Sequence, residues 1–517
     1  MSDSRTAAWQ QIEALPQETL GDLFAGDDAR VDRLSGRIGW GEGEDAAGIR
    51  FDWSKTHLTD DLLAGFEALA EASDFTAKRA ALFAGDPINV TEGRAAEHTA
   101  QRGFGSEASV EEAQALLARM QMLVEAIREG ALGQIEHLIH IGIGGSALGP
   151  ALAINALTRD LSYVDCHVVS NIDGVALEAA FEACDPATTM IAVASKTFTT
   201  IETMTNADSA LTWLRENGVT DPHGRVVALT ANPEAAVEWG VDETRVLPFM
   251  ESVGGRYSLW SSIGFPVALA AGLDEFAAML DGAAAVDEHF ANTDGRDNLA
   301  LRTAFADQFY ARVRGCQTRA VFAYDERLAL FPSYLQQLEM ESNGKRVQRD
   351  GAPVECETCP VIWGEPGSNA QHSFYQLLHQ GTAKVSVDFL LPVNSGVGRQ
   401  EQQDLAAANC LAQSWALASG DPAESDNDSH QACSGNHPNS LILFERLDPD
   451  TLGKLIALYE HKVFNQNVIW GINAFDQWGV QLGKRLATGV GGIILDENVA
   501  GPPPLEEPLV RFRKWRA

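Results

Sequence analysis

The 517-residue sequence is poor in basic residues, with 38 lysines and arginines against 72 aspartates and glutamates. The resulting formal charge of −34 makes binding to nucleic acid or to an anionic membrane electrostatically unfavourable. Long hydrophobic runs are also scarce, because the most apolar stretch, residues 263–273, contains Pro266 and is too short to span a bilayer. We therefore expect no nucleic-acid partner and no membrane insertion.

Cysteine is equally sparse. The seven cysteines are scattered and do not form the dense, even-numbered framework of small secreted domains. The first residues lack a basic segment followed by an apolar one, so we expect no export and a reducing, cytoplasmic location. The pair Cys356-x-x-Cys359 is half of a zinc-binding pattern, but no second CxxC or CxxH follows at a suitable spacing. We therefore expect no metal at this pair.

The hydrophobic pattern changes at about residue 115. Before it, apolar residues recur at spacings of three and four, which predicts helices at Thr6–Leu15, Asp60–Ala70 and Val110–Ile127. After it, short β-rich runs each precede a helical stretch, which predicts parallel strands with helices on both faces. The first series of expected strands is His137–Ile143, Cys166–Ser170, Thr189–Ala194 and Val226–Thr230. The apolar segment Tyr257–Leu273 is expected to form a long buried helix that closes this series.

A second series of strands and helices follows. Its expected strands are Ala320–Tyr324, Val361–Trp363, Val385–Leu391 and Leu441–Phe444. Its expected helices are Pro332–Glu341, Gln371–Gln380, Gln400–Ala418 and Thr451–Lys462. The Ser-, Asp- and His-rich residues 419–440 predict a loop, Ile472–Ala487 a helix, and Pro502–Pro504 the start of an extended tail.

A glycine-rich turn follows the first expected strand. Residues 142–146, GIGGS, precede a helix expected to begin near Ala147, with Pro150 in its first turn. Such a turn binds phosphate because backbone N–H groups, a hydroxyl and a helix N-terminus converge on it. The same residues satisfy G-x-G-x-x-G/A, so a sugar-phosphate site, a dinucleotide site and a plain tight turn all remain open. A dinucleotide site needs an acidic residue after the second strand, where Ser170 and Asn171 stand.

A second segment suited to phosphate binding is SKTFTT, residues 195–200. Hydroxyls, a lysine and a helix expected to begin near Glu202 converge there, at the carboxyl end of a parallel strand, where α/β sheets usually bind ligands. An ordinary Ser/Thr helix cap is the alternative. Further on, Arg256 directly precedes the apolar segment 257–273, where it either stabilises a developing oxyanion or forms a structural ion pair.

Three segments carry groups suited to proton transfer. Gln337 and Glu341 lie four residues apart on one face of a helix that Gly344 ends, where a partly desolvated carboxylate can act as a general base. His372 lies in the first turn of a helix, and histidine is the side chain best matched to proton transfer near neutral pH. A solvated glutamate and a structural histidine are the ordinary alternatives. One face of the expected helix 472–487 carries Gln477, Gln481 and Lys484.

Six motifs, in this order and at these separations, resemble the glucose-6-phosphate isomerase family: GIGGSALGP, SKTFTTIET, GGRYSLWSSIG, LEMESNGK, WGEPGSNAQHSFYQLLHQG and FDQWGVQLGK. The earlier GDPINVTEGRAAEHTA is similar to that family too, so the resemblance covers about residues 85–490. It implies an α/β fold class with two sugar-isomerase (SIS-type) α/β/α sandwich domains whose sheets are mainly parallel. We expect a helical N-terminal region, the two domains and a C-terminal extension at 1–115, 116–275, 276–480 and 481–517.

The resemblance also implies an activity. This is the reversible isomerisation of D-glucose 6-phosphate to D-fructose 6-phosphate in glycolysis and gluconeogenesis, through ring opening and a cis-enediol, without a metal or a redox cofactor. Glu341 resembles the family's proton-transferring base, and Arg256 resembles the cation near the enediolate. His372 and Lys484 resemble the groups that assist ring opening. The residues that match the family's substrate contacts are Gly145, Ser146, Ser195, Lys196, Thr197, Thr200, Glu202, Gln337 and Gln477.

In the family, the histidine equivalent to His372 is lent by the neighbouring subunit, which implies a homodimer. The sequence departs from the family pattern at Ala147, where many members have aspartate, and in residues 419–434, which have little familiar sequence. A non-catalytic sugar-phosphate-binding regulator and an NAD-dependent oxidoreductase are the alternative functions. The regulator should lack the base, whereas this chain has Glu341, and the oxidoreductase lacks its acidic partner. Additional activity on mannose 6-phosphate also remains open.

Overall fold

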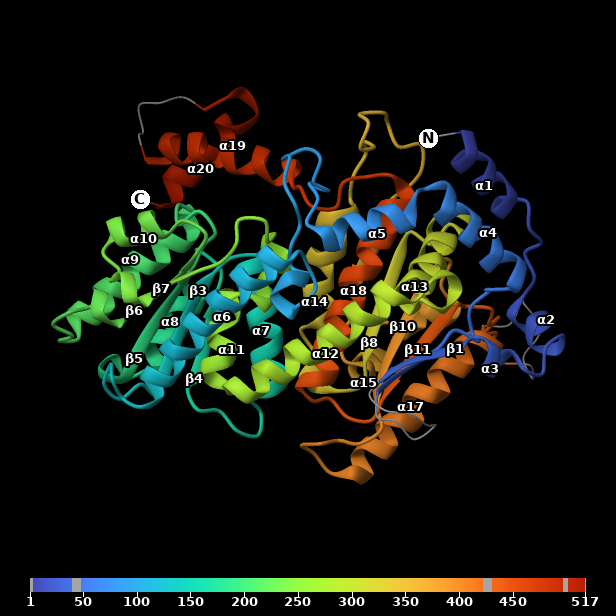
Figure 1. Ribbon diagram of the computed structural model, residues 1–517, viewed down its shortest axis with the longest axis horizontal. Coiled ribbons are helices and arrows are strands. Elements are labelled where there is room, and N and C mark those ends of the chain that lie inside the picture. Colours follow the sequence, from blue (N-terminus) through green and yellow to red (C-terminus); the bar gives the residue numbers. More distant parts are fainter. Residues whose placement is uncertain (1–2, 40–47, 422–429, 496–500, 517) are drawn as a thin grey trace. The chain divides into compact units, whose positions relative to one another are not determined.

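The computed structural model of the chain describes residues 3–39, 48–421, 430–495 and 501–516. The chain divides into two units, residues 1–474 and 475–517. The first unit contains two β-sheets with helices packed on them, and the second unit is helical (Figure 1). The expected loop 419–440 includes residues 422–429, which lie outside the described ranges.

The first sheet is parallel throughout. Its strands, in spatial order, are β4 (Asp165–Val169), β3 (His137–Gly142), β5 (Thr189–Ala194), β6 (Val226–Thr230) and β7 (Val246–Pro248). Every residue of β5 and β6 is buried, as expected of central strands with both faces covered. Four of the five strands were predicted from their apolar runs, and the short edge strand β7 was not. One face is covered by α8 (Val175–Ala183), α9 (Ile201–Glu216) and α10 (Pro233–Trp239).

The other face of this sheet packs against α6 (Glu107–Arg128), α7 (Gly145–Leu157) and α11 (Phe265–Ala270). Helix α7 begins two residues before the expected start, so Pro150 lies inside it rather than in its first turn. Ala147, at the position of the family's aspartate, is buried in α7. The first sheet thus forms the middle layer of an α/β/α sandwich (Figure 1).

The second sheet mixes parallel and antiparallel pairs. Its spatial order is β1 (Ser35–Gly39), β2 (Gly48–Asp52), β11 (Asn439–Phe444), β10 (Val385–Pro392), β8 (Thr318–Ala323) and β9 (Val361–Trp363). The last four strands are parallel and were all predicted. Strand β1 pairs with β2, and β2 pairs with β11, both in antiparallel fashion. The expectation of helices and loops alone before residue 115 was wrong here, because pairing with β11 joins this segment to the second sheet.

Helices cover both faces of the second sheet as well. One face packs against α15 (Gly367–Ser373), α16 (Tyr375–Gln380) and α17 (Gln400–Ser419). The other packs against α13 (Leu299–Gln308) and α18 (Pro449–Trp470), and α18 also runs beside α12 (Leu273–Asn292). The remaining N-terminal helices are α1 (Asp3–Glu13), α2 (Leu20–Ala25), α3 (Arg30–Arg33), α4 (Asp60–Ala72) and α5 (Phe75–Ala84). The predicted α/β fold class with mainly parallel sheets is confirmed.

Two expected helices are interrupted in the structure. The segment Tyr257–Leu273 is not one long helix but two 3₁₀ turns, η5 (Gly255–Trp260) and η6 (Ser262–Gly264), followed by α11. The hydroxyls of Ser258 and Ser261 donate to carbonyls three residues earlier, and such local bonds compete with an α-helix. The expected helix 371–380 is interrupted at Phe374, which separates α15 from α16.

The second unit differs from its prediction at both ends. Helix α19 (Trp478–Leu495) begins six residues after the expected start at Ile472, so Gln477 precedes the helix. The expected extended tail after Pro502 is helical instead, with a 3₁₀ turn, η12 (Pro503–Leu505), leading into α20 (Glu506–Arg516). Prolines at the first positions of a helix are compatible with it, because those N–H groups have no intrahelical partner.

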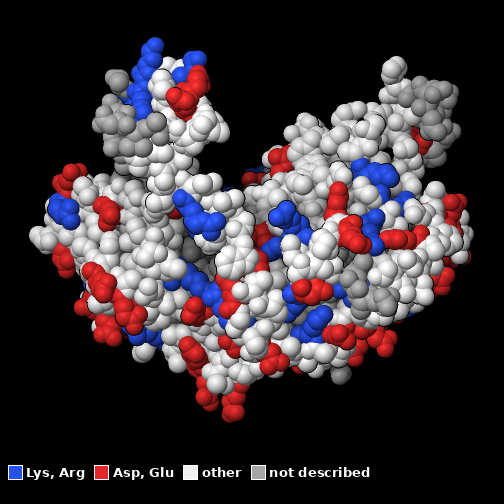
Figure 2. Space-filling model, turned by 90° about the horizontal axis from the view of Figure 1, so that it is seen from above, with Lys and Arg blue, Asp and Glu red and all other residues white. Residues whose placement is uncertain are grey.

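Acidic side chains are spread over the face of the molecule shown in Figure 2, with lysines and arginines interspersed among them. Among the described residues, no helix is both long enough and apolar enough to cross a membrane.

Candidate active site

The glycine-rich turn lies at the carboxyl end of β3. Gly144 adopts a left-handed φ of 59°, which favours glycine, and forms the N-cap of α7 without a capping side chain among the described residues. A Cβ on Gly145 would lie 2.2 Å from the backbone of Gly255. This turn therefore brings α7 into direct backbone contact with the segment that carries Arg256. Because no side chain caps α7 among the described residues, the positive end of its dipole is open to an anionic group.

Ser146 lies in the first turn of α7, and its carbonyl oxygen is held by His140. The His140 ring is fully buried on β3, and burial lowers its pKa to about 4. The ring is therefore neutral at pH 7, and its Nε2–H donates to the Ser146 carbonyl at 2.7 Å. This bond fixes the first turn of α7 to the strand that precedes it.

The segment 195–200 connects β5 to α9 at the same edge of the sheet. Ser195 and Thr200 share a hydrogen bond of 3.1 Å between hydroxyls, and Thr197 and Thr199 share one of 2.8 Å. Thr200 is the N-cap of α9, but its side chain does not cap the helix. The N-terminal N–H groups of α9 thus face a loop rich in hydroxyls, which is an arrangement suited to phosphate. Glu202, half-buried, lies in the first turn of α9.

Lys196 extends from this segment toward residues 251–253, which lie just before Arg256 in the sequence. Its ammonium group donates to the carbonyls of Glu251, at 2.5 Å, and Val253, at 3.0 Å. Burial, with a smaller effect of the Arg94 charge, lowers the pKa of Lys196 to about 8. The Coulomb attraction between a desolvated cation and an incoming dianion is stronger than that between a fully solvated cation and the same dianion.

Glu341 ends a helical element with unusual winding. After α14 (Phe331–Leu335) the chain continues as a π-helix, Gln336–Glu341, and this form is frequent at functional sites. Gln337 donates from Nε2 to Glu341 Oε2 at 2.8 Å, so the two residues share a face as predicted. The predicted helix end at Gly344 is also observed, because its N–H bonds to Met340 and helical winding stops there.

Arg256 approaches the other carboxylate oxygen of Glu341, the one that Gln337 does not contact. Its guanidinium Nη1 lies 3.6 Å from Glu341 Oε1, and the Arg256 side chain is 3% exposed against 18% for Glu341. The other guanidinium nitrogens donate to the Ser342 hydroxyl, at 2.7 Å, and to the Ala474 carbonyl. Gln337 also approaches the glycine-rich turn, since a Cβ on Gly144 would lie 3.0 Å from its Nε2. The turn, the arginine and the carboxylate therefore form one cluster at the carboxyl edge of the first sheet.

Two residues of this cluster were missed by sequence reasoning. Ser342 follows Glu341 and is fully buried, and its hydroxyl bonds both to Arg256 and, at 3.0 Å, to the hydroxyl of Tyr257. Tyr257 in turn follows Arg256. Each lies beside a predicted residue within a recognisable motif, which is the only signal that the sequence carries for them. Their buried bonds hold the guanidinium in place.

His372 lies apart from these contacts. It is exposed on α15 and makes no hydrogen bond or ion pair with the residues that the structure describes. Its neighbour Gln371 donates to the Tyr324 hydroxyl at 3.1 Å, which anchors the helix to the end of β8. Gln477 and Lys484 belong to the second unit, where Lys484 is exposed on α19. The structure thus brings Gly145, Gln337, Glu341 and Arg256 together, and it does not bring His372 to them.

Comparisons with known proteins agree with this geometry. A family model described as phosphoglucose isomerase matches residues 52–500. Glucose-6-phosphate isomerase of Erythrobacter litoralis (strain HTCC2594) is 63% identical over 506 residues, covering 96% of this chain and 98% of the relative, and that of Zymomonas mobilis is 51% identical over 94% of each chain. A crystal structure of a glucose-6-phosphate isomerase from Chlamydia trachomatis has a TM-score of 0.87 at 30% identity, covering 100% of this chain and 99% of the other. The chain therefore belongs to the phosphoglucose isomerase family.

Proposed function

We propose that this enzyme interconverts D-glucose 6-phosphate and D-fructose 6-phosphate, with Glu341 as the group that moves the proton between C2 and C1. The observation that carries the proposal is the convergence of Glu341, Arg256 and Gln337 beside the glycine-rich turn. Glu341 takes the C2 proton of the open-chain aldose, which gives a cis-enediol, and returns it to C1. Arg256 stabilises the negative oxygen that develops meanwhile.

The phosphate group of the substrate is assigned to the segment 195–200. Ser195, Thr197 and Thr200 supply hydroxyl donors, Lys196 supplies a cation, and the N-terminus of α9 supplies N–H groups. Gly145, Ser146 and Gln337 then contact the sugar, and Glu202 lies at the same edge. This division puts the charged end of the substrate on one loop and its reacting carbons on another.

Ring opening is assigned to His372 and Lys484, with Gln477 as a further substrate contact. His372 moves a proton between the ring oxygen and the C1 hydroxyl, and Lys484 assists it. We propose that His372 acts in the site of a second copy of the chain, so that a homodimer is the smallest active form. Its exposure and lack of partners among the described residues support this assignment.

The same proposal includes the domain limits and the location of the enzyme. Residues 116–275 and 276–480 are assigned as the two sugar-isomerase domains, with 1–115 and 481–517 as additions. A cytoplasmic location fits a substrate that carries a charged phosphate. Purified protein should convert fructose 6-phosphate to glucose 6-phosphate in buffer containing EDTA, as measured by enzymatic detection of the product. A folded but inactive protein would favour the alternative of a sugar-phosphate-binding regulator.

The charge of Lys196 should control the alkaline side of the pH profile. Its lowered pKa of about 8 means that the ammonium is charged below that pH and neutral above it. Because kcat/KM reports groups of the free enzyme, we expect it to fall as the pH rises through about 8. In Lys196→Met this alkaline fall should disappear, and kcat/KM at pH 7 should be about 10–100-fold lower, since a charge-assisted hydrogen bond is lost. Lys196→Arg, which keeps its charge, should move the fall to higher pH. An unchanged alkaline fall in Lys196→Met would assign it to another group.

Mixed dimers test the assignment of His372 across an interface. We expect His372→Asn and Glu341→Gln each to inactivate both sites of their own homodimers. Equal amounts of the two variants are mixed, unfolded and refolded together. Half of the resulting dimers contain one chain of each variant, and each of these mixed dimers has one site with both wild-type groups. Activity should therefore recover to about a quarter of the wild-type level. If His372 serves its own chain, every site keeps one defect and the mixture stays inactive.

A further inference from the structure

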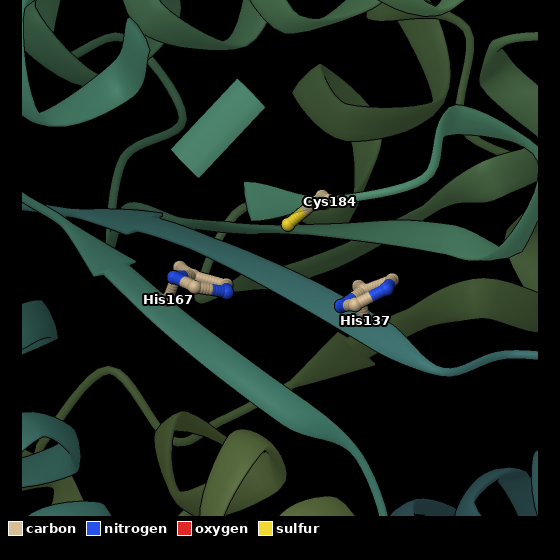
Figure 3. Close-up of side chains that lie close together, drawn as sticks. All are labelled: His137, His167 and Cys184. Carbon is tan, nitrogen blue, oxygen red and sulfur yellow. The ribbon is translucent and has the colours of Figure 1, made fainter. Parts of the chain in front are cut away.

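Three metal-ligating side chains lie together at the end of the first sheet opposite the glycine-rich turn. His137 is the first residue of β3, His167 lies on the neighbouring strand β4, and Cys184 directly follows α8. One donor atom from each lies within 4.8 Å of the other two. Figure 3 shows the two rings on adjacent strands, with the sulfur of Cys184 directed toward the side on which they lie.

The register of the sheet explains this convergence. In the parallel pairing of β3 with β4, His137 is opposite Asp165 and Ile139 is opposite His167. Alternate residues of a strand share a face, so His137, Asp165 and His167 all lie on the same face of the sheet. Helix α8 covers that face, and Cys184, 7% exposed, belongs to its hydrophobic core. Three separate elements thus deliver the donors to one place.

Two of the donors have buried nitrogens without hydrogen bonds. His137 Nδ1 and His167 Nε2 are shielded from solvent and make no hydrogen bond among the described residues, although Asp165 Oδ2 lies 3.3 Å from His167 Nε2. A buried polar atom without a partner is costly, and each one calls for an explanation. His140 on the same strand also has an unpaired Nδ1, but its Nε2 bonds to Ser146, and it belongs to no such group of donors. The pair at His137 and His167 is distinguished by the neighbouring thiol.

We propose that His137, His167 and Cys184 bind a divalent zinc-class metal ion. Imidazole nitrogen and thiolate sulfur are the donors that zinc prefers, at about 2.0–2.1 Å and 2.3 Å, and a tetrahedral site spaces its ligands about 3.3–3.8 Å apart. Side-chain shifts of about 1 Å bring the three donors to that spacing. Asp165 is not a member of this group of three, and it becomes the fourth ligand only after its side chain turns toward the ion. Its Oδ2 lies 3.3 Å from His167 Nε2, a separation that matches the edge of such a tetrahedron.

The charges of the four ligands suit a divalent ion. The thiolate and the carboxylate together carry two negative charges, and both histidines bind metal as neutral imidazoles, so the occupied site is electrically neutral. The Asp165 side chain is 66% exposed, which leaves a path for the ion from solvent. The Cys356 and Cys359 pair makes other contacts: Arg312 donates to Cys356, and Cys359 donates to the Glu339 carbonyl.

The proposed site is separate from the chemistry of the enzyme. Gly142, at the glycine-rich turn, lies five positions after His137 on β3, which is about 16 Å along a strand. The ion would tie β3, β4 and the end of α8 together, so its effect is on the stability of the first sheet. Activity in EDTA, which the proposed function requires, is compatible with this inference, and either can fail without the other.

Cobalt provides the direct test. The full-length protein is treated with EDTA, dialysed under reducing conditions and titrated with Co²⁺. We expect one Co²⁺ per chain, a thiolate-to-cobalt charge-transfer band, displacement by one equivalent of Zn²⁺, and a thermal midpoint several degrees higher with Zn²⁺ than without it. Cys184→Ser should lose the charge-transfer band. His167→Gln, at a half-buried position that tolerates a polar side chain, should weaken Zn²⁺ binding at least tenfold.

Cys433→Ser is the matched control, because it removes a thiol from outside the cluster. It should keep the band, the stoichiometry and the zinc-dependent shift. A wild-type protein without a charge-transfer band would overturn the proposal, as would a band that survives in Cys184→Ser or disappears in Cys433→Ser. If Cys184→Ser does not fold, unchanged Zn²⁺ affinity in His167→Gln also overturns it.

Discussion

Glu341→Gln is expected to lower kcat by about 10³–10⁴-fold, the upper range for loss of a positioned general base. Glutamine has the same length and can still bond to Gln337, but it cannot accept the C2 proton. KM should change much less, because the phosphate contacts on the segment 195–200 remain. The measurement is steady-state kinetics with fructose 6-phosphate, together with circular dichroism to show that the variant is folded. Loss of kcat at nearly constant KM marks a group that acts in the transition state.

Two further variants sharpen this result. Glu341→Asp keeps the carboxylate but withdraws it by one methylene, so we expect activity between those of the wild type and Glu341→Gln, since small misplacements cost up to about 10²-fold. Glu216→Gln changes an exposed glutamate at the far end of α9 and should leave kcat unchanged. Activity of Glu341→Gln within tenfold of the wild type would leave the reaction intact but would assign the base to another residue.

The parallel strands other than β7 were predictable because their residues form distinctive apolar runs in the local sequence. Strands β5, β6 and β9 have the predicted bounds, and β10 extends one residue further. Every residue of β5, β6 and β10 is buried, and buried parallel strands are continuous apolar runs. Strands β1 and β2 have no such pattern: SGRIG and GIRFD are short and contain glycine and arginine. Their pairing depends on β11, almost 400 residues later, and the local sequence carries no sign of that contact.

The candidate site was predictable in a similarly partial way. The bond between Gln337 and Glu341 follows from residues four apart on one helical element. The contact between Arg256 and Glu341, which lie 85 residues apart, depends on how η5 packs against the π-helix that ends at Glu341, and no periodicity encodes it. The π-helix that ends at Glu341 was expected as an ordinary helix, because single-turn changes in winding leave the hydrophobic pattern almost intact. His372, Gln477 and Lys484 remain predictions.

The same π-helix is held in place by a buried network of charged side chains that includes Glu339. Glu339, two residues before Glu341, contacts the guanidinium of Arg319 and lies 3.0 Å from Lys462 Nζ. Arg319 also contacts Asp388 and lies 3.5 Å from Asp307, and all of these side chains are at most 7% exposed. Three carboxylates therefore face two cations. Burial raises the pKa of Asp307, as expected where negative charge is in excess.

Arg319→Met is expected to destabilise the enzyme by about 3–5 kcal/mol, because it leaves three buried carboxylates facing Lys462 alone. Thermal and urea unfolding measure the loss. Arg446→Met, which removes an arginine that is 61% exposed and 3.2 Å from Asp448, should cost less than about 1 kcal/mol. Adding Glu339→Gln to Arg319→Met removes one uncompensated charge, so the double variant should be more stable than Arg319→Met. A double variant that is less stable than Arg319→Met would show that shape rather than charge balance determines the stability of this network.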